Sequence, residues 1–404
     1  MPTVVVLGTM DTKGRELGYV RDVIRAQGVD ALLVDMGVLE PPAVTPDITR
    51  EEVAEAAGID LEALAAKRDR GEAVAAMTRA AAVIARKLYE EGRLDGIISL
   101  GGSAGTTIGT SAMQALPVGV PKVMVSTLAS GDTRPYVGTK DITMMYSVVD
   151  IAGLNRLSRR ILGNAARAIA GMVKAEKDEA ADDKPIITAT MFGVTTPCVT
   201  FAREYLESRG YEVLVFHATG SGGRAMEGLI EDGFVSGVLD ITTTEWCDEL
   251  VGGVLSAGPH RLEAAGKRGI PQVVSVGALD MVNFGPPETV PEKFKGRRFY
   301  QHNPTVTLMR TTPEECAELG RIIAEKLNAA TGPTVVVLPL KGVSMIDAEG
   351  KPFYDPEADA ALFDALREHL RPEIRLVELD NHINDPEFAL TMAKILEELM
   401  AKGS

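Results

Sequence analysis

The sequence is short of cysteine and has no long hydrophobic run. Its three cysteines, Cys198, Cys247 and Cys316, are widely spaced and outside any CxxC pair, which favours a reduced protein over one held by disulfides. No apolar run approaches the ~18 residues that a transmembrane helix needs. No basic-then-apolar leader precedes Val4. We therefore expect a cytoplasmic protein with no membrane as partner.

Positive charge and histidine are also scarce. The chain carries 42 Lys and Arg against 57 Asp and Glu, a net charge of −15 at pH 7. Nucleic acids and anionic membranes are bound through basic faces, so we expect neither as a partner. No HExxH motif or paired histidine spacing supports a zinc site. A phosphorylated ligand is compatible with this charge, because backbone N–H groups and one or two cations can hold a phosphate.

The two halves of the chain open with the same pattern. Residues 4–35 and 186–216 each contain a β-branched run, a turn of small and polar residues, an amphipathic stretch, a glycine and a second apolar run. This order is typical of a βαβ unit. The repeat continues, because residues 94–106 resemble 235–248 and residues 119–132 resemble 269–280. At 404 residues the chain is also too long for one ordinary core.

These patterns predict an α/β protein with two Rossmann-like domains, each a doubly wound and mainly parallel sheet. The charged stretch 174–184 separates the domains, and we place the boundary near 182, giving domains 1–182 and 183–404. Residues 46–92 form a helical insertion in the first, where Thr49 and Glu52 resemble a capping box. Strands are expected near 3–7, 31–35, 96–100, 121–125, 186–190, 211–216, 235–240, 271–275, 334–338 and 374–379.

Ligands of such sheets bind at the carboxyl ends of the strands, so the loops that follow strands are the candidate sites. The first is 8–14, which contributes Gly8, Thr9, Asp11, Thr12, Lys13 and Gly14. Its glycines permit a tight turn, Lys13 is a cation, and Asp11 can hold Mg²⁺ through water. The loop matches neither GxxxxGK[ST] nor GxGxxG, and an ordinary turn with Asp11 or Thr12 as helix N-cap is the alternative.

The second and third loops follow the next two strands of the first half. The second contains Gly101, Gly102, Ser103, Gly105, Thr106 and Thr107, which enter a helix and predict an anion site or, alternatively, close helix–sheet packing. The third, 126–140, is long and polar, which is typical of a functional loop or lid. It offers Ser126, Thr127, Asp132 and Arg134. We expect all three loops at one sheet edge.

The second half of the chain contains a second group of candidate catalytic residues. Arg298, His302 and Asn303 lie in the long connection 277–304, which we expect to be irregular, and Arg310 follows it. His302 can act as general acid or base, Asn303 can orient a carbonyl and Arg310 can clamp an anion. A structural turn is the alternative. The hydroxyls of 242–244 are read equally as helix caps or as ligand contacts.

Five segments together, GTMDTKG, GGSAGT, STLASGDTRPY, HNPTVTLMRT and DNHINDPEFA, resemble one family. It comprises bacterial and fungal proteins related to the amino-terminal region of a tomato tobamovirus-resistance protein, an ATP-binding domain family. The resemblance extends from Val4 to Leu399. It implies two Rossmann-like subdomains, ATP with Mg²⁺ held by the first of them, and a homodimer.

The leading hypothesis is an ATP-dependent cytoplasmic enzyme acting on a small carboxylic or sugar acid in the crevice between the domains. The phosphates would sit on 101–107 and 8–14, Lys13 and Arg134 would neutralise them, and Asp11 or Asp132 would hold Mg²⁺. The second domain would present substrate to Arg298, His302, Asn303 and Arg310. Two alternatives stay open. One is a non-catalytic nucleotide sensor or scaffold that docks a protein, and the other is an ATP-independent lyase or hydrolase.

Overall fold

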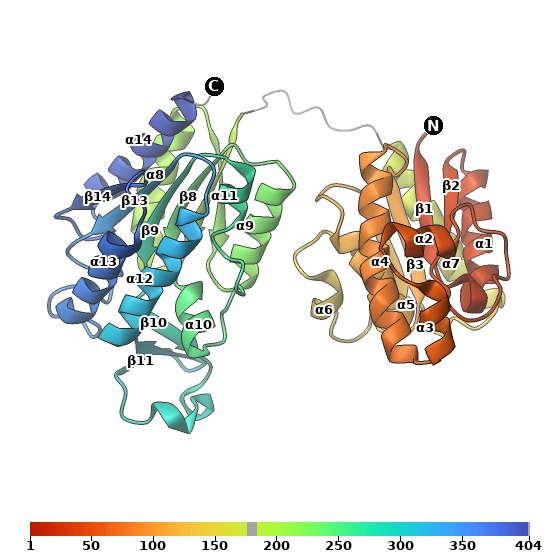
Figure 1. Ribbon diagram of the computed structural model, residues 1–404, viewed down its shortest axis with the longest axis horizontal. Helices are drawn as coiled ribbons and strands as arrows, with labels where there is room; N and C mark the ends of the chain where they lie inside the picture. The colour runs from red at the N-terminus through yellow and green to blue at the C-terminus, as the bar shows by residue number, and fades with distance from the viewer. Residues whose placement is uncertain (176–183, 403–404) are drawn as a thin grey trace. The chain divides into compact units, whose positions relative to one another are not determined.

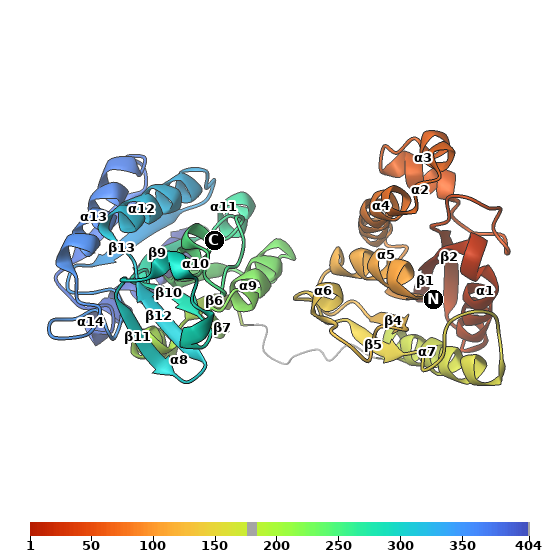
Figure 2. The ribbon, with the colours of Figure 1, turned by 90° about the horizontal axis from the view of Figure 1, so that it is seen from below.

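The computed structural model describes residues 1–175 and 184–402, and the chain divides into two compact units, Met1–Glu179 and Ala180–Ser404 (Figures 1 and 2). The boundary expected near 182 lies outside the described residues. No helix in the described part of the chain is long and apolar enough to cross a membrane.

Unit 1 is built on a five-stranded parallel sheet in the order β2-β1-β3-β4-β5. The strands are β1 (Thr3–Gly8), β2 (Asp30–Asp35), β3 (Gly96–Gly101), β4 (Lys122–Ser126) and β5 (Thr143–Tyr146). Consecutive residues of β1, from Val4 to Leu7, are all fully buried. Such an unbroken apolar run is typical of a parallel strand covered on both faces.

Helices cover the two faces of this sheet (Figure 2). Side chains alternate along β1, so Val4 and Val6 join one core with α1 (Met10–Ala26) and α7 (Arg156–Lys174). Val5 and Leu7 join the other core with α4 (Arg70–Glu90) and α5 (Ser103–Gln114). Three shorter helices, α2 (Arg50–Ala56), α3 (Leu61–Lys67) and α6 (Arg134–Val137), complete the unit.

The segment 46–92 contains α2, α3 and α4. The predicted capping box is present, because the Thr49 side chain accepts from the N–H of Glu52 while the Glu52 carboxylate accepts from the N–H of Thr49. A buried ion pair anchors α2, since Arg50 Nε donates to Asp35 Oδ2 at 2.9 Å. Asp35 Oδ1 also accepts from the N–H groups of Met10 and Gly37, at 3.0 and 2.8 Å. One carboxylate thus joins the end of β2, the start of α1 and the insertion.

Unit 2 contains a six-stranded parallel sheet in the order β14-β13-β9-β8-β6-β7. Its strands are β6 (Ile186–Met191), β7 (Glu212–His217), β8 (Gly237–Thr242), β9 (Gln272–Gly277), β13 (Thr334–Pro339) and β14 (Arg375–Leu379). The two parallel sheets confirm the predicted α/β class with two Rossmann-like domains.

The helices of unit 2 also form two layers. One core includes residues of α8 (Thr196–Ser208) and α14 (Pro386–Lys402), and the other includes residues of α10 (Glu245–Val251), α12 (Pro313–Asn328) and α13 (Pro356–His369). α9 (Ser221–Glu231) and α11 (Ala264–Arg268) pack together beside β7 and β8 in a smaller cluster.

The connection expected to be irregular is instead largely ordered. Its two ends and the segment that follows build a separate three-stranded antiparallel sheet of β10 (Met281–Phe284), β12 (Val306–Arg310) and β11 (Phe299–Asn303), in that order. Two short 3-10 turns, η2 (Pro287–Thr289) and η3 (Glu292–Phe294), lie between β10 and β11. The expectation of an irregular connection was therefore wrong, and it matters because three of the predicted catalytic residues lie in it.

Candidate functional site

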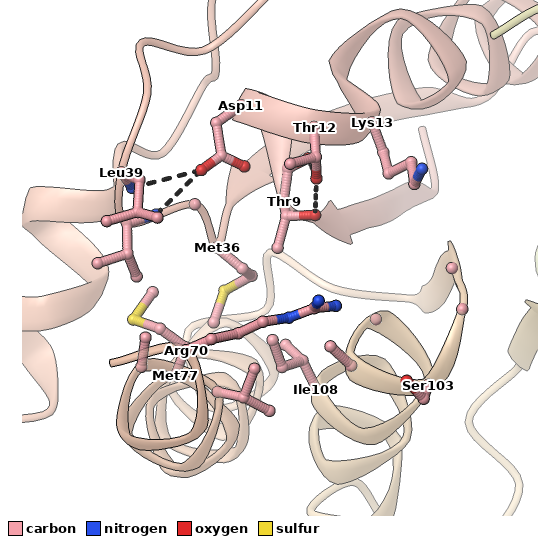
Figure 3. Close-up of a pocket in the computed structure, with 18 of the residues that line it drawn as sticks. Thr9, Asp11, Thr12, Lys13, Met36, Leu39, Arg70, Met77, Ser103 and Ile108 are labelled. Atoms are coloured by element: carbon pink, nitrogen blue, oxygen red, sulfur yellow. Dashed lines mark hydrogen bonds between the residues drawn. The ribbon is translucent and has the colours of Figure 1, made fainter. Parts of the chain in front are cut away.

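A pocket of about 570 Å³ lies at the carboxyl ends of β1, β2 and β3 in unit 1 (Figure 3). Eight of the residues predicted to contact a cofactor line it: Thr9, Asp11, Thr12, Lys13, Gly101, Gly102, Ser103 and Gly105. They come from two loops that the order β2-β1-β3 places side by side. All three loops were expected at one sheet edge, and they follow the neighbouring parallel strands β1, β3 and β4, but only the first two line this pocket.

The first loop forms the beginning of α1. Thr9 is the N-cap residue, so the alternative that Asp11 or Thr12 caps this helix does not hold. The hydroxyls of Thr9 and Thr12 hydrogen-bond to each other at 2.7 Å. Lys13 lines the pocket, and its ammonium has no hydrogen bond or ion pair within residues 1–175 and 184–402. A half-buried cation without a partner is available to an anionic ligand.

Asp11 is partly committed to the loop that follows β2. Its Oδ2 accepts from the N–H groups of Val38 and Leu39, at 3.3 and 3.4 Å (Figure 3). Its Oδ1 is buried and has no hydrogen-bond partner among the described residues. The loop comes close because residue 37 is glycine, where an added Cβ would lie 2.9 Å from Asp11 Cγ. One carboxylate oxygen of Asp11 is therefore buried without a hydrogen bond to the described chain.

The second loop leads from β3 into α5. Gly102 is the N-cap of α5, and no side chain of the described residues caps this helix. The first N–H groups of α5, which have no intrahelical acceptor, are therefore uncapped. Gly101 is required by the tight turn, because a Cβ there would lie 2.8 Å from Gly105 Cα. Ser103 and Gly105 line the pocket. An uncapped helix N-terminus facing a cavity is suited to an anion.

The other predicted cofactor residues do not line this pocket: Gly8, Gly14, Thr106, Thr107, Ser126, Thr127, Asp132 and Arg134. Thr106 and Ser126 are buried, and their hydroxyls hydrogen-bond to each other at 2.7 Å. Asp132 and Arg134 form an exposed pair with Oδ2 and Nη2 2.8 Å apart. The hydrogen bonds from Arg134 lower the pKa of Asp132 to about 2. The third loop therefore contributes structure and a surface ion pair, and none of its residues faces this cavity.

The insertion supplies a wall of the pocket that the sequence did not reveal. Leu64, Arg68, Asp69, Arg70, Ala73, Val74 and Met77 all line it. Figure 3 shows the Arg70 side chain reaching across the cavity, with its guanidinium between the Thr9–Thr12 side and the Ser103 side. Arg70 makes no side-chain hydrogen bond or ion pair in the part of the chain that the structure describes. No motif marks these residues, although the segment 36–45, which leads into the insertion, starts at the carboxyl end of β2 and thus at the ligand-binding edge.

The pocket has two chemically different ends (Figure 3). Met36, Leu39 and Met77 lie at one end. Thr9, Thr12, Lys13 and Ser103 lie at the other, and the Arg70 guanidinium extends toward them. A molecule with an apolar body and an anionic end would match this division.

The predicted hydroxyl cluster of unit 2 is internal. Thr242, Thr243 and Thr244 are fully buried. Their hydroxyls donate to the carbonyl oxygens of Thr190, Ser275 and Met281, at 3.0, 3.1 and 3.4 Å. Thr244 occupies the N-cap position of α10 without a side-chain cap hydrogen bond. These hydroxyls join neighbouring strands and loops.

Arg310, predicted to clamp a substrate anion, is buried within unit 2. Its Nη2 donates to Asp359 Oδ1 at 2.7 Å and lies 3.4 Å from Asp347 Oδ1, while its Nε donates to the Phe353 carbonyl at 2.9 Å. Burial raises the pKa of Asp280 and Asp359 well above the usual carboxyl range, and the nearby Asp347 charge adds to this. The guanidinium is thus occupied by groups of its own unit.

Of the remaining predicted catalytic residues, His302 and Asn303 lie in β11, and Arg298 immediately precedes it. The carbonyl of Arg298 accepts from the N–H of Arg310 at 2.9 Å, and both guanidinium groups contact Asp355. The Arg298 guanidinium donates to the Tyr354 carbonyl and pairs with Asp355 at 3.3 Å. Asn303 Oδ1 accepts from the N–H and the hydroxyl of Thr305, which closes a turn. His302 is exposed. His302 is four positions along the extended backbone from Arg298, about 13 Å, so the backbone places His302 away from Arg298 and Arg310.

Two doubly wound parallel-sheet units, the first with a pocket at its strand ends, define a two-domain Rossmann-like α/β protein. The chain belongs to the uncharacterised protein family UPF0261. The N-terminal domain of that family matches residues 2–178, and its C-terminal domain matches residues 184–400. The resemblance inferred from the sequence segments is confirmed by these matches and by the tomato relative below.

Relatives match over the whole length. A UPF0261 protein of Clostridium tetani is 59% identical over 400 residues, covering 99% of each chain. The tomato ToMV resistance protein Tm-1(GCR237) is 43% identical over the whole of this chain, which spans 56% of the tomato protein. Among solved structures, a UDP-N-acetylglucosamine 2-epimerase from Rickettsia bellii covers 100% of this chain and 96% of its own, at 11% identity and a TM-score of 0.22.

Proposed function

We propose that unit 1 binds a nucleotide, ATP with Mg²⁺, in the pocket at the ends of β1, β2 and β3. The observation that carries this proposal is the convergence on one cavity of Lys13 and Arg70, two cations without a side-chain partner in residues 1–175 and 184–402, and of the uncapped N-terminus of α5. These groups are the usual means by which proteins hold phosphates. They supply local positive charge in a chain whose net charge is −15.

The cavity fits such a ligand in size and in the arrangement of its walls. Its volume of about 570 Å³ lies inside the range of about 300–1,000 Å³ that is common for small-molecule pockets. The apolar end, with Met36, Leu39 and Met77, suits a base, and the end with Lys13 and Ser103 suits phosphates. The distribution of side chains therefore matches the two parts of a nucleotide.

Asp11 is the residue that would hold the Mg²⁺ ion. Mg²⁺ bound with nucleotides commonly takes one or two carboxylates together with phosphate oxygens, and Asp11 Oδ1 is a carboxylate oxygen without a partner among the described residues. Asp132, the other predicted ligand, is paired with Arg134 and does not line the cavity. We therefore assign the proposed ion to Asp11 alone.

The proposed function is nucleotide binding, and an ATP-dependent reaction on a small acid is its proposed use. One observation favours a second candidate, a nucleotide sensor that does not consume ATP. Of the residues expected to carry chemistry, Arg310 is buried in an internal ion cluster, Arg298 is paired with Asp355 and Asn303 closes a turn. We further propose a cytoplasmic homodimer. The three cysteines are unpaired and buried, which suits a reducing compartment.

Calorimetric titration of the full chain with ATP, with and without Mg²⁺, tests the proposal. We expect saturable binding that Lys13→Gln weakens about tenfold or more, because hydrogen bonds between charged groups contribute about 1.5–3 kcal/mol. Arg15→Gln is the control, since it removes a charge from the same helix at a residue that does not line the pocket. No binding at millimolar ATP, or equal loss in both variants, would refute the assignment. Phosphate release by the same samples separates the enzyme from the sensor.

A further inference from the structure

We infer that this pocket selects its ligand by the number of phosphates and hardly by the base, so that its ligand class is purine nucleoside triphosphates rather than ATP alone. This inference rests on the proposed function and adds a specificity to it. It follows from three features of the cavity. These are the side chains at its apolar end, the backbone N–H groups there, which are already hydrogen-bonded, and the position of Arg70.

The apolar side chains at this end cannot read the edge of a base. Met36, Leu39 and Met77 lie there. None of them carries a nitrogen or oxygen, and a thioether sulfur is only a weak acceptor. Asp69, the N-cap of α4, also lines the cavity, and its Oδ1 accepts from the N–H of Glu72 at 2.9 Å.

The backbone donors of this end are already used. The N–H of Gly37 donates to Asp35 at 2.8 Å, and those of Val38 and Leu39 donate to Asp11. Three consecutive N–H groups that could have read a base edge therefore serve the loop itself. Adenine and guanine differ in the hydrogen-bonding groups of that edge while their ring systems have the same size. An apolar slot of this kind holds both through similar contact area.

Discrimination without hydrogen bonds is weak. A hydrophobic pocket separates similar ligands by about 10–200-fold, whereas a site that pairs with a polar group rejects the wrong ligand by about 10⁴–10⁵-fold. The apolar end of this cavity is a hydrophobic pocket, so the weaker discrimination applies to it. We therefore expect ATP and GTP to bind with affinities within about 100-fold of each other.

The polar end, in contrast, carries groups that can bind the negative charge of phosphates. Arg70 is the first residue of α4, and its side chain extends from the insertion wall across to the side of Thr9, Thr12 and Ser103 (Figure 3). An arginine can hold phosphate oxygens through two parallel N–H bonds. Lys13 and the N-terminus of α5 stand at the same end. Each phosphate removed from the ligand takes away negative charge that these groups would otherwise neutralise.

The backbone just before α4 also supports a role for Arg70 in binding the ligand. Arg68, the C-cap of α3, has φ +52°, a left-handed conformation that is uncommon for residues other than glycine. Only Arg68 and Asp69 separate α3 from α4. The strained residue ends α3 abruptly and lets α4 begin at the cavity, which brings Arg70 to the pocket.

The test is a competition titration of the full chain with ATP, GTP, ADP and AMP in the presence of Mg²⁺. We expect GTP within about 100-fold of ATP. AMP should bind more weakly than ATP by more than about 100-fold, because each charged hydrogen bond that is lost weakens binding about tenfold or more. Arg70→Gln should weaken ATP and GTP by the same factor, about tenfold or more, and change AMP by less than about threefold. Arg70→Lys should give an intermediate loss, because it keeps the charge without the two parallel bonds.

The control is Arg79→Gln, which removes an arginine from the same helix at a residue that does not line the pocket. Arg70 is exposed and has no side-chain partner in the described chain, so its variants should fold, and far-UV circular dichroism verifies this. GTP weaker than ATP by more than about 100-fold overturns the inference on the base. An equal effect of Arg70→Gln on AMP and ATP overturns the inference on the phosphates. If no nucleotide binds at all, the proposed function itself fails.

Discussion

The ion pair between Asp35 and Arg50 offers a sharp test of how unit 1 holds its pocket together. Both side chains are buried, with exposed fractions of 1% and 8%. In Asp35→Asn the amide oxygen can still accept from the N–H groups of Met10 and Gly37. The amide nitrogen, however, would face the Arg50 Nε that now donates to Asp35 Oδ2 at 2.9 Å. The variant therefore sets two donors against each other and leaves a buried guanidinium without its counter-charge.

The expected loss of stability is large. Removing one partner of a buried ion pair costs about 3–5 kcal/mol, because the other charge stays desolvated. At about 2–4 °C per kcal/mol for a domain of this size, the melting temperature of unit 1 should fall by roughly 6–20 °C. The double variant Asp35→Asn with Arg50→Met removes both charges, and replacement of a whole buried pair by an apolar group is often nearly neutral. We expect it to recover at least half of the loss.

The chain carries a built-in internal control for this measurement. Its single tryptophan, Trp246, lies in α10 of unit 2. Tryptophan fluorescence therefore follows unit 2 directly, while far-UV circular dichroism follows the helices of both units. Thermal unfolding of Asp35→Asn should show a lower dichroism transition and an unchanged fluorescence transition. If the variant melted like the native chain, or if the double variant were no better than the single one, the pair would not stabilise unit 1 as argued.

Two further measurements test buried carboxylates in unit 2 and glycine positions in unit 1. Burial raises the pKa of Asp248 to about 7 and also raises those of Asp280 and Asp359. The folded state therefore holds protons that the unfolded state releases near pH 4, so unit 2 should lose stability from about pH 4 to pH 7. A stability of unit 2, followed by tryptophan fluorescence, that rises over this range would contradict the prediction. Gly101→Ala should weaken ATP binding and destabilise unit 1 by about 1–3 kcal/mol, because its Cβ would lie 2.8 Å from Gly105 Cα. Gly171→Ala, with no atom within 4 Å of its Cβ, should stabilise α7 by about 0.5–1 kcal/mol; equal effects of the two changes would refute the steric argument.

The parallel sheets could be predicted because burial on both faces leaves a strong signal in the sequence. The run from Val4 to Leu7 is apolar at every position, which an exposed strand would not be. β11 has no such signal, since Gln301, His302 and Asn303 are exposed on a short strand of a small sheet. Polar residues in that pattern are typical of a loop as well, so the antiparallel sheet was missed.

Polar residues at strand ends are ambiguous in a sequence because it does not show which partner satisfies them. Arg310 looks like a residue that could bind an anion, and its anions are Asp347 and Asp359, which lie 37 and 49 residues further along the chain. The hydroxyl of Thr243 is satisfied by the Ser275 carbonyl, 32 residues away. In both cases the partner is a matter of tertiary structure, and the side chain alone cannot distinguish an internal contact from a ligand.

The same limit explains why the insertion was read as structure and not as part of a site. Its helices carry many alanines and no recognised motif, and Arg70 is one of several arginines on α4. What distinguishes Arg70 from Arg79 is position, since α4 begins beside the cavity and Arg79 lies nine residues, about two and a half turns, further on. The wall of the pocket is therefore set by where the helix starts, which depends on the Asp69 cap and the left-handed Arg68. A sequence pattern identifies the two glycine-containing loops, whereas the third wall follows from the path of the chain between β2 and β3.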